Sequence, residues 1–326
     1  MSLINDKTCG WINSLNPRKN IKSLENNCKC DFVIIGAGFT GLSAARKLGQ
    51  IHGDKKIIIV DAQLAGEGAS SRNSGYLVDT TLNDGFTSNK DIENYKKKIK
   101  IYEQSIKAVR NFIKEYQVEC DWNECGKYFA SSTMKDESKA EEFSNILSSL
   151  YFKNEILHQN DLKQKLGTDF YKIAVYTNGG ILLHPGKLAR SMVETLPNNI
   201  DLFENTQLIS WKKINNKIQC NFKNYTIEAD QIIFCTNGFL SSNGIKPRYS
   251  FPITLTASMT RPLTNDEFKS AIINSWALVF LYSCHLISTP RTQYPSFFNR
   301  FTKWLPTNPA PPVTTKRIWQ LIFVCL

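Results

Sequence analysis

The chain alternates short, unbroken apolar runs with longer segments in which apolar residues recur every three or four positions. The runs at 32–35, 57–60 and 232–235 are too short for stable helices. Unbroken apolar runs of this length are typical of strands that are buried on both faces of a parallel sheet. The segment 40–50 has helical spacing and lies between the first two runs. The pattern therefore predicts a strand–helix–strand unit near the start of the chain, with a further strand of the same sheet much later.

The segment 91–116 has the clearest helical pattern in the chain. Its apolar residues recur at alternating spacings of three and four, which places them in one stripe along a helix. A coiled coil and a helix packed on a sheet both fit such a stripe, and we favour packing on a sheet. The stripe comprises Ile92, Tyr95, Ile99, Tyr102, Ile106, Val109, Ile113 and Tyr116.

The middle of the chain is predicted to contain further elements of both kinds. Strands and helices that follow one another in this way, between the first strands of a sheet and a later one, indicate a second domain inserted into a doubly wound α/β fold. The predicted elements are a strand at 126–130, a helix at 135–150, a helix at 187–196, and paired strands at 200–211 and 217–222.

A glycine-rich turn links the first predicted strand to the first predicted helix. It reads Gly36-Ala37-Gly38-Phe39-Thr40-Gly41, and Asp61 ends the second strand about twenty residues later. Gly36 permits a tight turn, Gly38 lets the backbone approach a pyrophosphate, and Gly41 lets the helix pack closely on the strand. The helix N-terminus offers N–H groups and a positive dipole to phosphates. Because a carboxylate at Asp61 can accept ribose hydroxyls, the combination predicts a dinucleotide site.

Composition and charge narrow the class of protein. The 326 residues accommodate two domains, or one large interleaved domain, and 42% of them are hydrophobic. The net charge is +11, but the lysines are spread among glutamates and asparagines, which argues against nucleic-acid binding. The nine cysteines form no CxxC pair and no cluster with histidine, so we expect neither a metal site nor structural disulfides. The first residues lack the pattern of a secretory signal, and we expect a cytoplasmic protein.

Four separated stretches resemble the D-amino-acid-oxidase-type family of FAD-dependent oxidoreductases, and within it the branch of γ-glutamylputrescine oxidase and glycine oxidase. The first stretch is 31–48 with 57–62, and the second is 66–75, similar to the segment that the family lays along the pyrophosphate and flavin ring. The third and fourth are 180–188 and 232–239, in the same order as in the family. The residues themselves also favour FAD, because a plain NAD site needs only the first stretch.

The resemblance implies FAD, and implies that it is bound without a covalent link, since 66–75 contains neither histidine nor cysteine. Asp61 departs slightly from the family, which more often has glutamate there. No catalytic residue is assigned, and His184 before Pro185 is interpreted as a structural helix start rather than a base. The cofactor-binding residues that the resemblance implies are Gly36, Ala37, Gly38, Phe39, Thr40, Gly41, Asp61, Ala62, Ala69, Ser70, Arg72, Asn73, Ser74, Gly75, Leu208, Thr236 and Gly238.

The implied fold is α/β, and α+β overall, with a Rossmann-like FAD-binding domain interleaved with an antiparallel-sheet substrate domain. An N-terminal arm at 1–30 is expected to be anchored by Trp11, Pro17 and Leu24. Both domains are discontinuous in this prediction. The FAD-binding domain comprises 31–88 and 178–248, and the substrate domain comprises 89–177 and 249–276.

The resemblance fades near Trp276, and the composition changes there. After Glu267 the sequence has no Asp or Glu up to Leu326, and half of its twelve prolines fall in this part. Because a soluble domain of ordinary composition would contain several acids, we expect 277–326 to be out of frame or disordered and the chain to be truncated. A membrane segment at 271–287 and a basic RNA-binding extension are less favoured alternatives.

Three functions stay open at this point. The first is oxidation of a C–N bond in a small amine or amino acid, with hydride transfer to the flavin, hydrolysis of the imine and oxygen as the acceptor. The second is a truncated remnant that catalyses nothing. The third is an FAD oxidase that modifies wobble uridines in tRNA. The substrate and the oligomeric state do not follow from the sequence, and no stable membrane insertion is expected.

Overall fold

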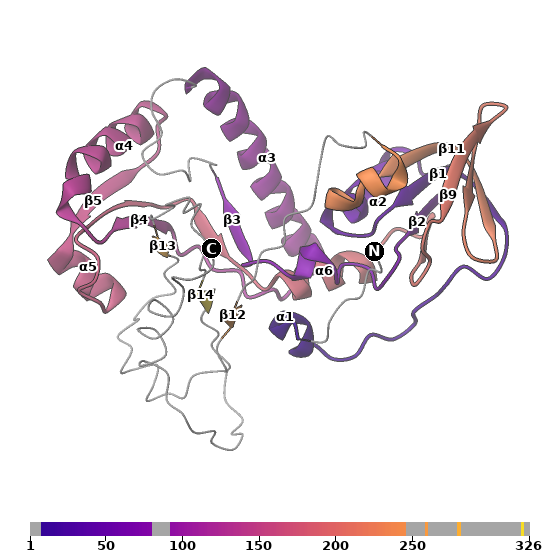
Figure 1. The fold of residues 1–326 in the computed structure, drawn as a ribbon, viewed down its shortest axis with the longest axis horizontal. Coiled ribbons are helices and arrows are strands. Elements are labelled where there is room, and N and C mark those ends of the chain that lie inside the picture. Colours follow the sequence, from indigo (N-terminus) through magenta and orange to yellow (C-terminus); the bar gives the residue numbers. More distant parts are fainter. Residues whose placement is uncertain (1–7, 80–91, 246–257, 260–278, 282–320, 323–326) are drawn as a thin grey trace, which may run out of the picture.

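Two sheets lie on either side of one long helix, α3 (Ile92–Tyr116), in the computed structural model (Figure 1). The larger sheet contains the strand–turn–helix unit, and the smaller sheet is built from three strands of the middle of the chain and one short strand near its end. Most of the expected tail at 277–326 lies outside the described residues. Within the tail, β13 (Val279–Leu281) and β14 (Leu321–Ile322) are described as short strands. The structure describes residues 8–79, 92–245, 258–259, 279–281 and 321–322.

The larger sheet has six strands in the order β8-β2-β1-β11-β10-β9. The first four strands in this order run parallel, and β10 and β9 continue the sheet as antiparallel strands. The three apolar runs of the sequence lie in β1, β2 and β11, so the predicted mixed α/β fold is confirmed. The strands are β1 (Cys28–Ile35), β2 (Ile57–Val60), β8 (Ile200–Phe203), β9 (Ser210–Ile214), β10 (Lys217–Asn221) and β11 (Thr226–Phe234).

The single strand predicted at 200–211 is wrong, because the chain leaves the sheet between β8 and β9. The Glu204 N–H donates to the Lys22 carbonyl at 2.7 Å, and the Thr206 N–H donates to the Asp61 carbonyl at 2.8 Å. These bonds direct the backbone away from the ladder. As a result β8 pairs in parallel with β2, whereas β9 pairs with β10 in the antiparallel hairpin.

Both faces of the parallel part of the larger sheet are buried, as its unbroken apolar runs require. On one face, Ile34 packs in a cluster with residues of α2 (Phe39–Ile51) and α6 (Pro185–Glu194). On the other face, Val33 belongs to a cluster that includes Leu24 from the N-terminal segment. The predicted helix at 40–50 is α2, and the one at 187–196 begins earlier, at Pro185.

The smaller sheet has the strand order β13-β4-β6-β5 and a helix on each face. Phe129 of β4 packs against Phe143 of α4, with ring centroids 4.8 Å apart. The neighbouring Tyr128 belongs to the cluster on the opposite face, together with Leu162 of α5. The predicted strand at 126–130 and helix at 135–150 are present as β4 and α4. The elements are β4 (Lys127–Ser131), α4 (Glu137–Ser149), β5 (Asn154–His158), α5 (Gln159–Leu166) and β6 (Ile173–Thr177).

The helix α3 connects the two sheets through its apolar stripe. Ile99 joins the core on the α4 side of the smaller sheet. Further along the stripe, Ile113 packs in a cluster with Leu183, which lies just before α6, and with Leu188, which lies within α6. The predicted packing of this helix on a sheet is therefore confirmed, and the stripe bridges two cores.

A two-stranded ribbon and a buried ion pair also join the two parts. β3 (Tyr76–Val78) pairs antiparallel with β7 (Gly180–Leu182). Directly after β3, Asp79 Oδ1 accepts a bond of 2.8 Å from Lys127 Nζ, whose side chain is fully buried. Burial lowers the pKa of Lys127, and the charge of Asp79 opposes that shift. The ion pair thus fixes the start of β4 to the end of β3.

None of the helices in the described ranges is long and apolar enough to cross a membrane. The same ranges contain no cluster of His, Cys, Asp and Glu arranged to hold a metal ion, and their cysteines are free thiols.

The remaining elements of the described chain are short. They are α1 (Gly10–Asn13), η1 (Ala69–Ser71), η3 (Met134–Asp136), η4 (Asn237–Phe239), η5 (Ser241–Asn243) and β12 (Ser258–Met259).

Candidate functional site

The glycine turn between β1 and α2 is packed too tightly for side chains at two positions. Gly36 has a φ angle of +101°, a conformation that residues with a Cβ rarely adopt. A Cβ on Gly36 would lie 2.6 Å from the Cys235 carbonyl oxygen, and a Cβ on Gly41 would overlap the Gly36 carbonyl oxygen. Gly38 is the N-cap of α2, so the helix begins at Phe39 and Thr40. The helix N-terminus is therefore held directly against the end of β1.

A second turn lies beside the first, where β11 ends. The Cys235 N–H donates to the Ile35 carbonyl at 2.7 Å, which continues the pairing of β11 with β1 past the end of the strand. Thr236 follows, and Asn237 and Gly238 form the first part of η4. The two turns therefore meet at the carboxyl ends of neighbouring parallel strands, which is where open α/β sheets bind ligands.

Asp61 follows β2 and supports the glycine turn with its side chain. Its Oδ2 accepts the Ala37 N–H at 2.8 Å, and its Oδ1 accepts the Gln63 N–H at 2.9 Å. Burial raises the pKa of the Asp61 carboxyl, and these two bonds oppose the shift. Each carboxylate oxygen has a second lone pair. The Asp61 carboxylate can therefore accept ribose hydroxyls while it fixes the turn. Ala62 follows it directly in the chain.

The glycine-serine loop, residues 66–75, packs against the start of α2. Ser70 Oγ accepts the Phe39 N–H at 2.8 Å. This N–H is one of the donors that a helix start leaves without a partner inside the helix. Gly38 lies close by, because a Cβ on it would be 2.8 Å from the same hydroxyl oxygen. A phosphate drawn to this helix N-terminus would thus meet backbone N–H groups and the Ser70 hydroxyl together.

Asn73 holds the second half of the glycine-serine loop in one conformation. Its Nδ2 donates to the carbonyls of Ala69, at 3.0 Å, and Ser70, at 2.8 Å. Its Oδ1 accepts the Gly75 N–H at 2.8 Å, across Ser74. In the same loop, Arg72 Nε donates to the Glu67 carbonyl at 3.0 Å. Asn73 and Arg72 therefore brace the loop from within.

The predicted cofactor residues meet at one place, with the exception of Leu208. Direct contacts link the glycine turn to Asp61, to the glycine-serine loop and to the Cys235 backbone. The half-buried Leu208 side chain packs against the core cluster that includes Val33, and a contact of its backbone with the cofactor stays a prediction. The result is a cradle of backbone N–H groups and small side chains, with a carboxylate on one side. These residues fit the pyrophosphate and ribose of FAD, and their individual roles stay predictions.

His184 is the N-cap of α6 and so lies in the turn before a helix, and the expectation that it is not a base stays a prediction. Its Nδ1 accepts the Lys187 N–H at 3.1 Å. A neutral ring that accepts at Nδ1 carries its proton on Nε2, which lies 3.0 Å from Ser14 Oγ. Burial lowers the pKa of His184 to about 4, and the Lys187 charge adds to this shift.

We expect the stability of the chain to fall as the pH is lowered from about 6.5 to about 4, in part because of His184. In this window the unfolded chain binds a proton at residue 184 and the folded chain does not. Stability is therefore fully present above the unfolded pKa of 6.5, and the loss is on the order of 3 kcal/mol. The nearby charges are those of Lys187, Asp121 and Arg190. Urea unfolding at a series of pH values measures the effect.

The matched variant is His184→Asn. Asparagine is a good N-cap that accepts the same N–H and does not titrate. The variant is expected to lose less stability than the wild-type chain over this pH range. Equal losses in the two proteins would show that His184 does not contribute.

The N-terminal arm, residues 8–24, is anchored differently from the prediction. Trp11 and Leu24 make the expected contacts, but Pro17 is exposed, and its predicted role as an anchor is wrong. The neighbouring Arg18 is the anchor instead, because its guanidinium forms a two-pronged ion pair with the buried carboxylate of Glu204. Nothing in the local pattern around an arginine in a polar stretch indicates such a distant partner.

The sequence is similar to a known family and to known proteins. The family model described as "FAD dependent oxidoreductase" matches residues 31–294. A probable oxidoreductase, OrdL, of Haemophilus influenzae is 24% identical over 268 residues, which cover 76% of this chain and 59% of that protein. Gamma-glutamylputrescine oxidoreductase of Escherichia coli is 23% identical over 270 residues, covering 81% of this chain and 63% of that protein. The chain spans about three fifths of the length of these relatives.

Solved structures show the same fold. Glycine oxidase from Geobacillus kaustophilus superposes with a TM-score of 0.62 at 13% sequence identity, covering 78% of this chain and 66% of that one. L-Proline dehydrogenase from P. horikoshii superposes with a TM-score of 0.58 at 14% identity, covering 78% of this chain and 65% of that one. At these identities the likeness establishes the fold alone.

Proposed function

The chain belongs to the family of FAD dependent oxidoreductases, and from this premise we propose that it oxidises a C–N bond in a small amine or amino acid, with FAD as the hydride acceptor. The observation that carries the proposal is the contact of the two backbone turns, 36–41 and 236–238, with the glycine-serine loop set against the same helix start. A nicotinamide dinucleotide needs only the first turn. The added loop lengthens the cradle, as the larger flavin ring system requires.

FAD supplies the difficult step, because its ring system accepts a hydride from the carbon next to the amine. In the proposal the chain binds and orients the cofactor. The glycine turn and Ser70 hold the pyrophosphate, Asp61 holds the ribose, and Asn73 fixes the loop beside the ring. Arg72 is directed along the loop by its bond to Glu67. In this proposal the pyrophosphate charge is met by the helix start and the Ser70 hydroxyl, and a contact with Arg72 stays a prediction.

The substrate in this proposal is a small amine that has a C–H bond next to its nitrogen. The nitrogen must be neutral when the carbon gives up its hydride, and a weakly polar pocket favours loss of the ammonium proton. Water then adds to the C=N bond and releases a carbonyl compound and the amine or ammonia. Molecular oxygen takes up the two electrons and two protons as hydrogen peroxide. Gamma-glutamylputrescine, glycine and proline, named in the relatives, are all compounds of this class.

The test begins with FAD bound to the full chain. We expect the purified protein to show the blue absorption band of oxidised flavin, and to lose that band without oxygen when a suitable amine is added. Glycine, sarcosine, proline and gamma-glutamylputrescine are the probes. Readmission of oxygen should restore the band and yield one peroxide for each amine consumed. Succinate, which has no nitrogen, is the control compound and should leave the band unchanged.

The outcomes separate the alternatives. A protein that binds FAD but is bleached by none of these amines contradicts the proposed oxidation and supports the non-catalytic remnant. Retention of tRNA that weakens steeply with salt, together with inertness toward amines, would support the tRNA-modifying oxidase instead.

A further inference from the structure

The glycine-serine loop is held from outside by the N-terminal arm. The Trp11 indole Nε1–H donates to the Asn73 carbonyl oxygen at 2.8 Å. Two residues earlier, the Cys9 thiol lies 3.4 Å from the Ser71 carbonyl oxygen. The Asn73 side chain fixes the loop from within, and the Trp11 bond adds a contact from outside at the carbonyl of the same residue.

A directional chain of hydrogen bonds connects this contact to the start of α6. The Lys187 N–H donates to His184 Nδ1, and His184 Nε2–H then donates to Ser14 Oγ. The Ser14 hydroxyl donates to the Trp11 carbonyl at 2.8 Å, and the Trp11 indole donates to Asn73. Each group in the chain has the donor and acceptor that its place requires. The Trp11 ring also packs on the His184 ring, with centroids 4.6 Å apart.

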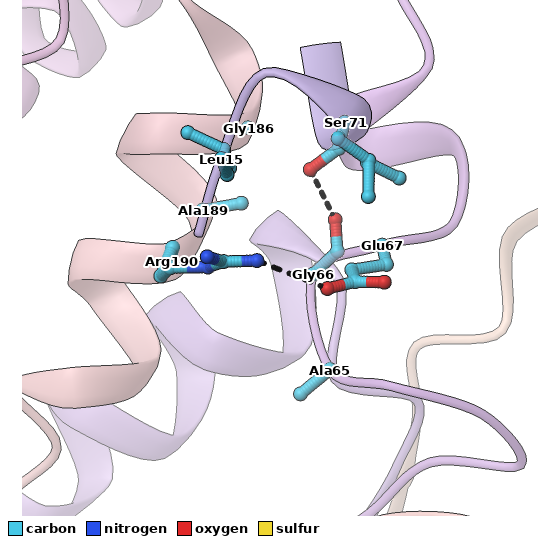
Figure 2. Close-up of a pocket in the computed structure, with 9 residues that line it drawn as sticks. Leu15, Ala65, Gly66, Glu67, Ser71, Gly186, Ala189 and Arg190 are labelled. Carbon is cyan, nitrogen blue, oxygen red and sulfur yellow. Dashed lines mark hydrogen bonds and ion pairs between the residues drawn. The ribbon is translucent and has the colours of Figure 1, made fainter. Parts of the chain in front are cut away.

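Side-chain packing closes the arm over the loop and α6. A small cavity of about 10 Å³, which has room for roughly one water molecule, lies between these three parts. Figure 2 shows the residues that line it. Leu15 of the arm faces Gly186 and Ala189 of α6 there, and the Arg190 guanidinium points at Glu67 of the loop, 3.3 Å away. The same guanidinium donates to the Asn16 carbonyl. The arm, the loop and α6 therefore form one closed contact.

We propose that Trp11 and Ser14 are positioning residues that fix the glycine-serine loop in its FAD-binding conformation, so that FAD release requires the arm to lift. The loop carries the Ser70 hydroxyl that caps α2 beside the phosphate site, and it leads into β3. A shift of the Asn73 peptide would therefore move both the phosphate contact and the residues placed beside the ring. This inference rests on FAD binding and does not depend on which amine is oxidised.

The test is Trp11→Phe in the full chain, with FAD and without any amine. Phenylalanine keeps a ring against His184 but has no N–H for Asn73. Loss of one neutral hydrogen bond predicts FAD dissociation about three- to tenfold faster, and a weaker Kd by the same factor. Ser14→Ala breaks the chain one step earlier, and a smaller effect in the same direction is expected. FAD fluorescence during titration and after dilution gives both quantities.

Two further readouts distinguish positioning from general loss of structure. Amide hydrogen exchange at 73–75 should become faster in Trp11→Phe without FAD, while exchange in β4 and β6 stays unchanged. The visible circular dichroism of bound FAD should change as well. The matched control is Trp122→Phe, which removes an indole N–H bonded to the Glu124 carboxylate outside the site. It should leave FAD binding unchanged.

Wild-type rates of FAD release in Trp11→Phe, with wild-type exchange at 73–75, would overturn the proposal. Failure of the wild-type chain to bind FAD would overturn it as well, together with the proposed function. A chain that binds FAD and oxidises no amine contradicts the proposed function alone.

Discussion

Replacing Gly41 with alanine is expected to remove detectable FAD binding and to lower the free energy of unfolding by about 2–4 kcal/mol. The added Cβ would lie closer than 3.0 Å to the Gly36 carbonyl oxygen, and it would also contact the Cys235 side chain at 3.5 Å. The atom in the way is backbone, so it cannot rotate aside as a side chain would. Because Gly36 is itself held by the Val60 carbonyl, at 2.8 Å, α2 must move away from β1.

The consequence for the cofactor follows from what α2 presents. Its first N–H groups and the Ser70 hydroxyl form the phosphate site, and both depend on the position of the helix start. FAD titration followed by fluorescence, with urea unfolding of the same protein, measures the two effects. Gly53→Ala is the matched control, since nothing lies within 4 Å of a Cβ there, and its stability should stay within about 0.5 kcal/mol of wild type. Wild-type FAD affinity in Gly41→Ala would show that the turn is not the phosphate cradle.

The parts of the fold that depend on neighbours in sequence were predictable. The runs that became β1 and β2, the turn between β1 and α2, and the stripe of α3 each follow from spacing within a short window. Gly41 is needed because of the Gly36 carbonyl within that same window, whereas the crowding at Gly36 comes from the distant backbone of Cys235 and Thr236. The residues of this strand–turn–helix unit are therefore enough to predict the unit and to predict a nucleotide site at its turn.

The parts that depend on distant partners were not predictable from the pattern. The run at 200–211 reads as one strand, but bonds from Glu204 to Lys22 and from Thr206 to Asp61 divide it. The Leu208 side chain is partly buried against the core cluster, which its apolar character does predict, but nothing in the local pattern indicates the break that precedes it. The bond of Trp11 to Asn73 likewise joins two polar segments that have no periodicity. Spacing reports which face of an element is buried, and it does not report which polar group will be its partner.

Removal of the Arg18 charge is expected to destabilise the chain by about 3–5 kcal/mol, because it leaves a carboxylate buried without its cation. Glu204 is 1% exposed, and the Arg18 side chain is 7% exposed. The Glu204 carboxylate accepts hydrogen bonds from the two terminal nitrogens of the Arg18 guanidinium and also from the Ala65 N–H, at 2.6 Å. It therefore cannot turn toward solvent without breaking the bond to Ala65. Arg18→Met keeps the apolar stem of the side chain and removes the charged guanidinium. Urea unfolding gives the loss of stability.

The comparison with an exposed pair decides whether burial is the cause. Lys217 and Asp230 form an ion pair whose side chains are 53% and 45% exposed, and Lys217→Met should be much less destabilising than Arg18→Met. Arg18→Met combined with Glu204→Leu removes both buried charges and should be less destabilised than Arg18→Met alone. A loss in Arg18→Met no larger than that in Lys217→Met would contradict the argument. Since this pair ties the arm to the end of β8, its loss should also free the arm, so Arg18→Met is expected to release FAD faster for the same reason as Trp11→Phe.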